Sequence, residues 1–141
     1  MINFFKNKEK NKTNNDISFS KIASLLIHAA KIDEIYTNEE KDIIKKTLIE
    51  LGAENSNIDK LIDEASIIEE KSNQILSFTN EIKNLTISNK IRIAEALWKI
   101  IYSDNNSDIY ESNLMRRLTG LLYIDAKTMG NIKEKIKKEL I

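Results

Sequence analysis

Two short acidic segments, residues 33–40 and 104–111, hold the side chains best suited to chemistry in this chain. Their candidate metal-binding acids are Asp33 and Glu40 in the first segment and Asp104, Asp108 and Glu111 in the second. Carboxylate and carbonyl oxygens gathered in a tight loop are the ligands that Ca²⁺ and Mg²⁺ require. The segments therefore predict weak binding of a divalent cation, with a dissociation constant of ~10⁻⁴ to 10⁻³ M.

The same acids also have a purely structural interpretation. Thr37 with Glu40 and Asp108 with Glu111 have the spacing of a capping box, which satisfies free backbone amides at a helix start. Capping of this kind contributes about 1 kcal/mol. The remaining acids, Asp33 and Asp104, are expected at the C-terminal end of a helix, where the helix dipole disfavours negative charge. Capping and cation binding stay open as interpretations, and both can hold at once.

The second segment is similar to an EF-hand loop only at Asp104, Asn106 and Asp108. Ile109 stands where the calcium loop has Gly, and Met115 stands where it has a bidentate Glu. These two mismatches argue against a genuine EF-hand.

The second acidic segment follows the first by 71 positions, and this offset extends on both sides. It pairs Leu26 with Leu97, Ile43 with Leu114, Leu51 with Leu122, and Lys45 and Lys46 with Arg116 and Arg117. The pattern predicts an internal duplication in which each acidic segment connects two helices.

The composition of the 141 residues favours helices and excludes several functions. There is no Pro and there are only three Gly, which argues for helices with short connections. Lys plus Arg equals Asp plus Glu at 22 each, so no net charge would hold nucleic acid. The absence of Cys removes disulfides, thiolate zinc sites and cysteine nucleophiles.

Apolar residues at three-and-four spacing predict seven helices in one domain, residues 18–141. Two helices are predicted over Ser18 to Lys31 and Ile75 to Leu85, and the second helix in the chain is predicted to end at Gly52. The other four are predicted to start at N-terminal caps, which are Ser56, Ser88, Asp108 and Asp125. The helix after Ser88 is the most apolar and is expected at the centre. We predict an all-α, compact seven-helix bundle with an approximate internal two-fold repeat.

Two single residues are predicted to be structural. His28 is the only histidine, so it cannot form a histidine cluster and is expected to be a packed or half-exposed helix residue. Trp98 lies in the most apolar helix and is expected in the core.

The N-terminus is predicted to be a disordered basic tail over residues 1–17. Residues 1–12 carry four Lys and one Glu, and residues 6–16 contain no apolar side chain. No segment approaches the roughly 20 apolar residues of a membrane span, so we expect a cytoplasmic protein. Membrane contact would be at most peripheral, on the inner face, through residues 1–12.

The later part of the chain carries motifs of a known family. They are Phe78 with Thr79, the run Leu97, Trp98 and Lys99, the acids Asp104, Asp108 and Glu111, and the basic pair Arg116 and Arg117. Through these motifs the chain resembles the TerB-like family associated with tellurite resistance, over about residues 18–136. The resemblance implies a compact helical domain, an acidic surface implicated in divalent-metal binding, and protein partners in membrane-associated stress systems.

The resemblance has departures and limits. Glu34 and Asn105 replace glycines of the family, Asn38 and Ile109 replace prolines, and Thr37 replaces an acid. The second segment therefore matches better than the first. The chain is also similar to the N-terminal part of a membrane-anchored J-domain co-chaperone, but without an anchor, and a J domain itself needs a proline.

These observations predict a non-enzymatic helical module that docks on protein partners and holds a divalent cation weakly at its acidic loops. The sequence has no Cys, one His, no Gly-rich phosphate loop and no paired nucleophile and base, which argues against an enzyme. Two alternatives stay open. One is a membrane-surface adaptor that uses residues 1–12, and the other is a metal-assisted hydrolase using Asp104, Asp108 and Glu111, which would need an enclosed pocket.

Overall fold

The computed structural model describes residues 19–32, 36–72, 74–103 and 109–139, with side chains described from Asn113 onward in the last range. The predicted tail over residues 1–17 lies outside the described residues, and so do Asp33, Asp104 and Asp108. The side chain of Glu111 lies outside them too.

The described residues form seven α-helices and one short 3₁₀ turn. They are a helix over residues 19–30, then α2 (Asn38–Glu50), η1 (Asn55–Asn57), α3 (Ile58–Lys71), α4 (Leu76–Ile82), α5 (Ile87–Tyr102), α6 (Ile109–Leu121) and α7 (Ala126–Glu139). The all-α bundle of seven helices is thus confirmed.

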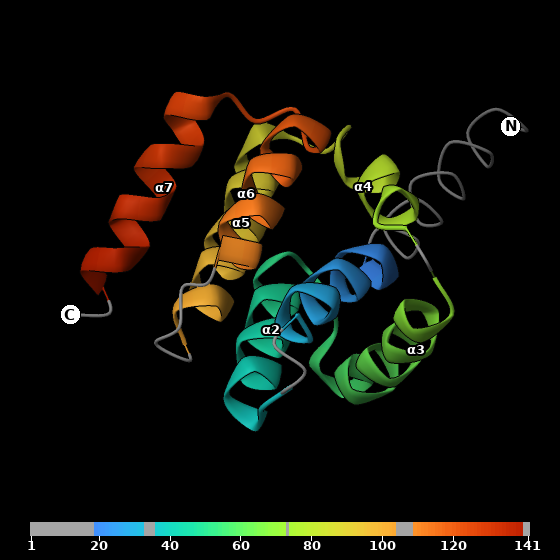
Figure 1. The fold of residues 1–141 in the computed structure, drawn as a ribbon. Coiled ribbons are helices and arrows are strands. Elements are labelled where there is room, and N and C mark those ends of the chain that lie inside the picture. The colour runs from blue at the N-terminus through green and yellow to red at the C-terminus, as the bar shows by residue number, and fades with distance from the viewer. Residues whose placement is uncertain (1–18, 33–35, 73, 104–108, 140–141) are drawn as a thin grey trace, which may run out of the picture.

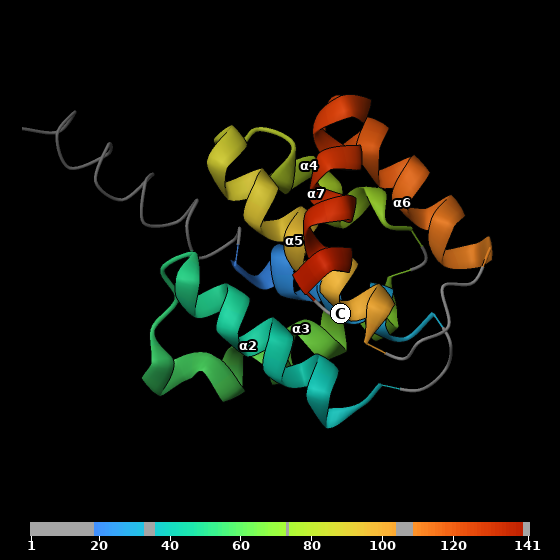
Figure 2. The ribbon, with the colours of Figure 1, turned by 90° about the vertical axis from the view of Figure 1, so that its left-hand side faces the viewer.

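The most apolar helix, α5, runs through the middle of the bundle as predicted. It packs against α7 on one side and α2 on the other, while α4 packs against α6 (Figures 1 and 2). Ile93, Ala94 and Leu97 on α5 are fully buried. The helix over residues 19–30, blue in Figure 1, has an equally buried apolar stripe, which includes Leu25 and Leu26. These stripes meet in one hydrophobic core.

Of the caps predicted at Ser56, Ser88 and Asp125, two were wrong and one was right. The hydroxyl of Thr86 accepts a hydrogen bond from the Asn89 amide at 3.2 Å, so α5 begins before Ser88, which lies inside its first turn. Ser56 lies within η1, and α3 begins after Asn57 without a side-chain cap. Asp125 caps α7 as expected, since its carboxylate accepts from the Thr128 amide at 2.7 Å. Adjacent polar residues compete as caps, and spacing alone does not choose among them.

The helices α2 and α6 end in the same hydrogen-bonded turn, a Schellman motif. The residue with positive φ is Gly52 (φ 115°) after α2 and Tyr123 (φ 56°) after α6. In each turn this residue donates to the carbonyl three residues earlier, at 3.0 and 3.3 Å. The next residue donates to the carbonyl five residues earlier, at 2.9 and 3.1 Å. The two turns are 71 positions apart, although the duplication itself stays a prediction.

Replacing Gly52 with Ala is expected to lower the free energy of unfolding by about 1 kcal/mol. An added Cβ would lie 3.6 Å from Cζ of Phe19, an ordinary contact, so the cost comes from the positive φ. Urea unfolding of Gly52→Ala measures it. Gly120→Ala is the control, because a Cβ there meets nothing within 4 Å and Ala favours a helix interior. Equal stability changes in the two variants would contradict the backbone explanation.

Candidate functional site

The described end of the first acidic segment forms the predicted capping box at the start of α2. The Thr37 hydroxyl accepts from the Glu40 amide at 3.1 Å, and the Thr37 amide donates to Oε1 of Glu40 at 2.9 Å. The same Oε1 also accepts from the Thr37 hydroxyl at 3.1 Å. Glu40 is 2% exposed, so its carboxylate is held inward over the helix start. The capping interpretation is confirmed for this pair.

A half-buried tyrosine with a buried hydroxyl, Tyr36, lies one residue before the cap. The hydroxyl of Tyr36 has no hydrogen-bond partner within the described ranges. Burial, followed by the negative charges of Glu40 and Asp63, raises the pKa of Tyr36 to about 12. Tyr36 is therefore neutral at physiological pH, and its hydroxyl is a hydrogen-bond donor within the first acidic segment.

The cation site itself stays a prediction. Of the five candidate acids, only Glu40 has a described side chain. Within residues 19–32, 36–72, 74–103 and 109–139 there is no group of three or more His, Asp or Glu side chains that could hold a metal ion.

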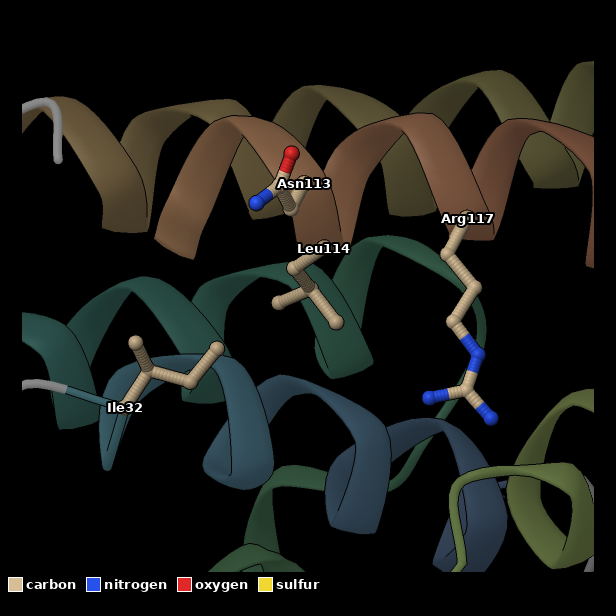
Figure 3. A pocket seen from close by; sticks show the side chains of 4 residues that line it. All are labelled: Ile32, Asn113, Leu114 and Arg117. Carbon is tan, nitrogen blue, oxygen red and sulfur yellow. The ribbon is translucent and has the colours of Figure 1, made fainter. Parts of the chain in front are cut away.

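An open groove between the end of the helix over residues 19–30 and α6 is the site that sequence reasoning missed. Among the described residues, four line it, and we call it the α6 groove: Ile32, Asn113, Leu114 and Arg117 (Figure 3). Its volume is about 410 Å³. Leu114 is 8% exposed and Ile32 is half-buried, whereas Asn113 and Arg117 are exposed. The groove thus has an aliphatic floor and a polar, cationic rim.

The guanidinium of Arg117 extends from α6 toward the helix over residues 19–30 (Figure 3). Neither Arg117 nor its neighbour Arg116 forms an ion pair or a hydrogen bond within the described ranges. No described side chain therefore compensates the charge of this basic pair. By contrast Lys45, which corresponds to Arg116 in the predicted repeat, binds Asp59 at 2.7 Å.

A second polar cluster joins the helix over residues 19–30 to α3. Oε1 of Glu69 lies 2.6 Å from the Lys31 ammonium, and Oε2 lies 3.2 Å from Nδ1 of His28. Burial by itself raises the pKa of Glu69, but the hydrogen bonds from Lys31 and His28 outweigh it and leave the pKa below its ordinary value. His28 is a half-buried helix residue as predicted, and the cluster connects two helices rather than forming a pocket.

Trp98 is a core residue, as predicted, and not part of a contact surface. It is 6% exposed, and its Nε1 donates to the sulfur of Met129 at 3.3 Å. Its ring stacks on Tyr102 with centroids 5.7 Å apart. The contact with Met129 attaches α7 to α5, whereas the stack on Tyr102 lies within α5.

Comparison with known proteins agrees with the motifs and the fold. A family model described as "Tellurite resistance protein TerB" matches residues 20–134, which is most of the chain. The chain belongs to the TerB family. Searches of curated proteins and of solved structures gave no match. None of the helices in the described part of this TerB-family chain combines the length and apolar character needed to cross a membrane.

Proposed function

We propose that this TerB-family chain is a non-enzymatic module that docks on a protein partner in a stress-response or tellurite-resistance-type system. The observation that carries the proposal is the α6 groove. Interface centres combine a desolvated apolar contact with polar groups at the rim, and Arg is enriched in them. Ile32 and Leu114 supply the apolar contact, and Asn113 and Arg117 supply the rim.

The chemistry of the groove lining supports binding rather than catalysis. A guanidinium stays protonated in proteins and cannot serve as a general base, and an amide such as that of Asn113 does not titrate. Ile32 and Leu114 have no reactive group. The groove is also open to solvent, whereas metal-assisted hydrolysis favours a shaped, dry cavity.

Site-specific photocrosslinking tests the docking site. A benzophenone amino acid at Asn113, on the exposed rim, is expected to give a discrete crosslinked protein adduct in cells that express the full chain at its native level. The matched control is the same substitution at Asn131, which is exposed on α7 and outside the groove. No adduct from position 113, or the same adducts from both positions, would overturn the proposal.

We further propose that the acidic segments bind Ca²⁺ or Mg²⁺ weakly, with Asp104, Asp108 and Glu111 as the main ligands and Asp33 and Glu40 as a second set. The support is the oxygen-rich spacing of the second segment. Near the first segment, the carboxylates of Glu40 and Asp63 both add negative charge around Tyr36. A ligand at ten times its dissociation constant stabilises the folded state by about 1.4 kcal/mol, which corresponds to a few degrees in Tm.

Asp104→Ala is expected to abolish the rise in Tm that Ca²⁺ produces, while the Tm without metal changes little. The reason is that the substitution removes one proposed carboxylate ligand. Differential scanning calorimetry with and without 10 mM Ca²⁺ (~10 times the weaker dissociation constant) measures this, beside isothermal titration. The control Glu134→Ala removes an exposed acid of α7 and should keep the full response. An unchanged response in Asp104→Ala would refute the assignment of ligands.

A further inference from the structure

We infer that the α6 groove recognises a segment of the partner protein in which an aliphatic side chain is followed closely by a carboxylate. This inference rests on the proposed docking function and adds the chemistry of the segment that binds.

The floor of the groove selects the aliphatic part. Of the described residues that line it, the apolar ones are Leu114 and Ile32, and both are aliphatic. A volume of about 410 Å³ is large enough for one or two aliphatic side chains. Burying a Leu or Ile side chain against such a floor is favourable by roughly 25 cal/mol for each Å² of apolar surface removed from water.

The rim selects the carboxylate. The Arg117 guanidinium lies over the groove and has no described acceptor, unlike the cations Lys31 and Lys45, which already bind Glu69 and Asp59. A guanidinium presents parallel N–H donors that match the two oxygens of a carboxylate. Asn113 offers an amide that can both donate to and accept from the backbone of a bound segment.

The recessed position of the apolar residues favours a protein segment over a membrane surface. Membrane-surface binding uses protruding apolar side chains on a basic face. Here Leu114 is only 8% exposed and Ile32 is half-buried, so neither apolar side chain protrudes as a membrane-binding residue would. The zero net charge of the chain likewise gives no general attraction to an anionic surface.

Methyl NMR of the full-length protein tests the inference with two peptides, SGLLEDGS and its uncharged counterpart SGLLQNGS, both capped at their ends. The acidic peptide is expected to shift the methyl signals of Ile32 and Leu114 and to bind about tenfold more tightly than the uncharged one, a difference of about 1.4 kcal/mol. Equal affinities of the two peptides would overturn the inference.

Two exposed arginines provide the matched variants. Arg117→Gln is expected to remove the preference for the acidic peptide, whereas Arg116→Gln, outside the groove, should retain most of it. Equal losses in both variants would mean that nonspecific electrostatic attraction causes the preference, and this would overturn the inference. Methyl shifts caused by anionic lipid vesicles and abolished by Arg117→Gln would also overturn it, in favour of a membrane.

The two proposals fail separately. If neither peptide binds while position 113 still gives its discrete adduct, docking stands and the acidic-aliphatic segment is wrong. If the acidic peptide binds with the expected arginine dependence but position 113 gives no adduct, the groove chemistry stands and docking in cells is wrong.

Discussion

Replacing Phe78 with Ala is expected to lower the free energy of unfolding by about 3–5 kcal/mol, the range for large buried aromatic side chains. Phe78 is 1% exposed and belongs to α4, which has only seven residues. A helix this short has little stability of its own, so its buried side chains hold it in place. Loss of the ring would leave a cavity and would also weaken the packing of α4 on α6.

Equilibrium unfolding in urea, followed by circular dichroism, measures the change. Leu76→Ala in the same helix is the control, because Leu76 is 39% exposed and should lose less than about 1 kcal/mol. Phe78→Leu should fall between the two. A loss in Phe78→Ala no larger than that in Leu76→Ala would show that α4 contributes little to the stability of the bundle.

Replacing Glu69 with Gln is expected to lower the free energy of unfolding at neutral pH by about 1–2 kcal/mol. The substitution keeps the shape of the side chain but removes the charge that Lys31 and His28 contact. Glu69 is largely buried, while the side chains of Lys31 and His28 are 38% and 35% exposed, so solvent screens part of the interaction. The loss is therefore smaller than for a fully buried ion pair.

The pH dependence of this loss follows from the lowered pKa of Glu69. A carboxyl whose pKa is lower in the folded state stabilises the protein at any pH above its unfolded-state pKa, which is about 4.3 for Glu. That contribution disappears as the pH falls through the folded-state pKa. The difference between Glu69→Gln and the parent protein should thus be full at neutral pH and should shrink in acid below about pH 4.

Urea unfolding of both proteins across this pH range provides the test. Glu70→Gln, at the exposed neighbouring position, is expected to change stability by no more than about 0.5 kcal/mol at any pH. A double-mutant cycle with Lys31→Met isolates the pair itself. A Glu69→Gln difference that stays constant down to acidic pH would mean that the charge of Glu69 does not contribute.

Helix existence and local turn chemistry were predictable from the sequence because they depend on residues a few positions apart. The apolar stripe of α5 is repeated every three or four residues, and its burial follows directly from that period. The capping box of Thr37 and Glu40 spans three residues, and Gly52 is the residue that a positive φ favours. Tyr123, at the corresponding turn after α6, carries no such signal and was not predicted to adopt a positive φ.

The chain by itself therefore determined the helical class, the central helix, the buried Trp98 and the family motifs. Only the tertiary structure decided that Ile32 lies opposite Leu114 and Arg117, and that Glu69 reaches Lys31 across 38 positions of sequence. The physical reason is that periodicity defines which face of a helix is apolar but not how far two helices are apart or which end of one meets which end of another. A groove and an ion pair between helices depend on those relative positions, so neither leaves a pattern in the sequence.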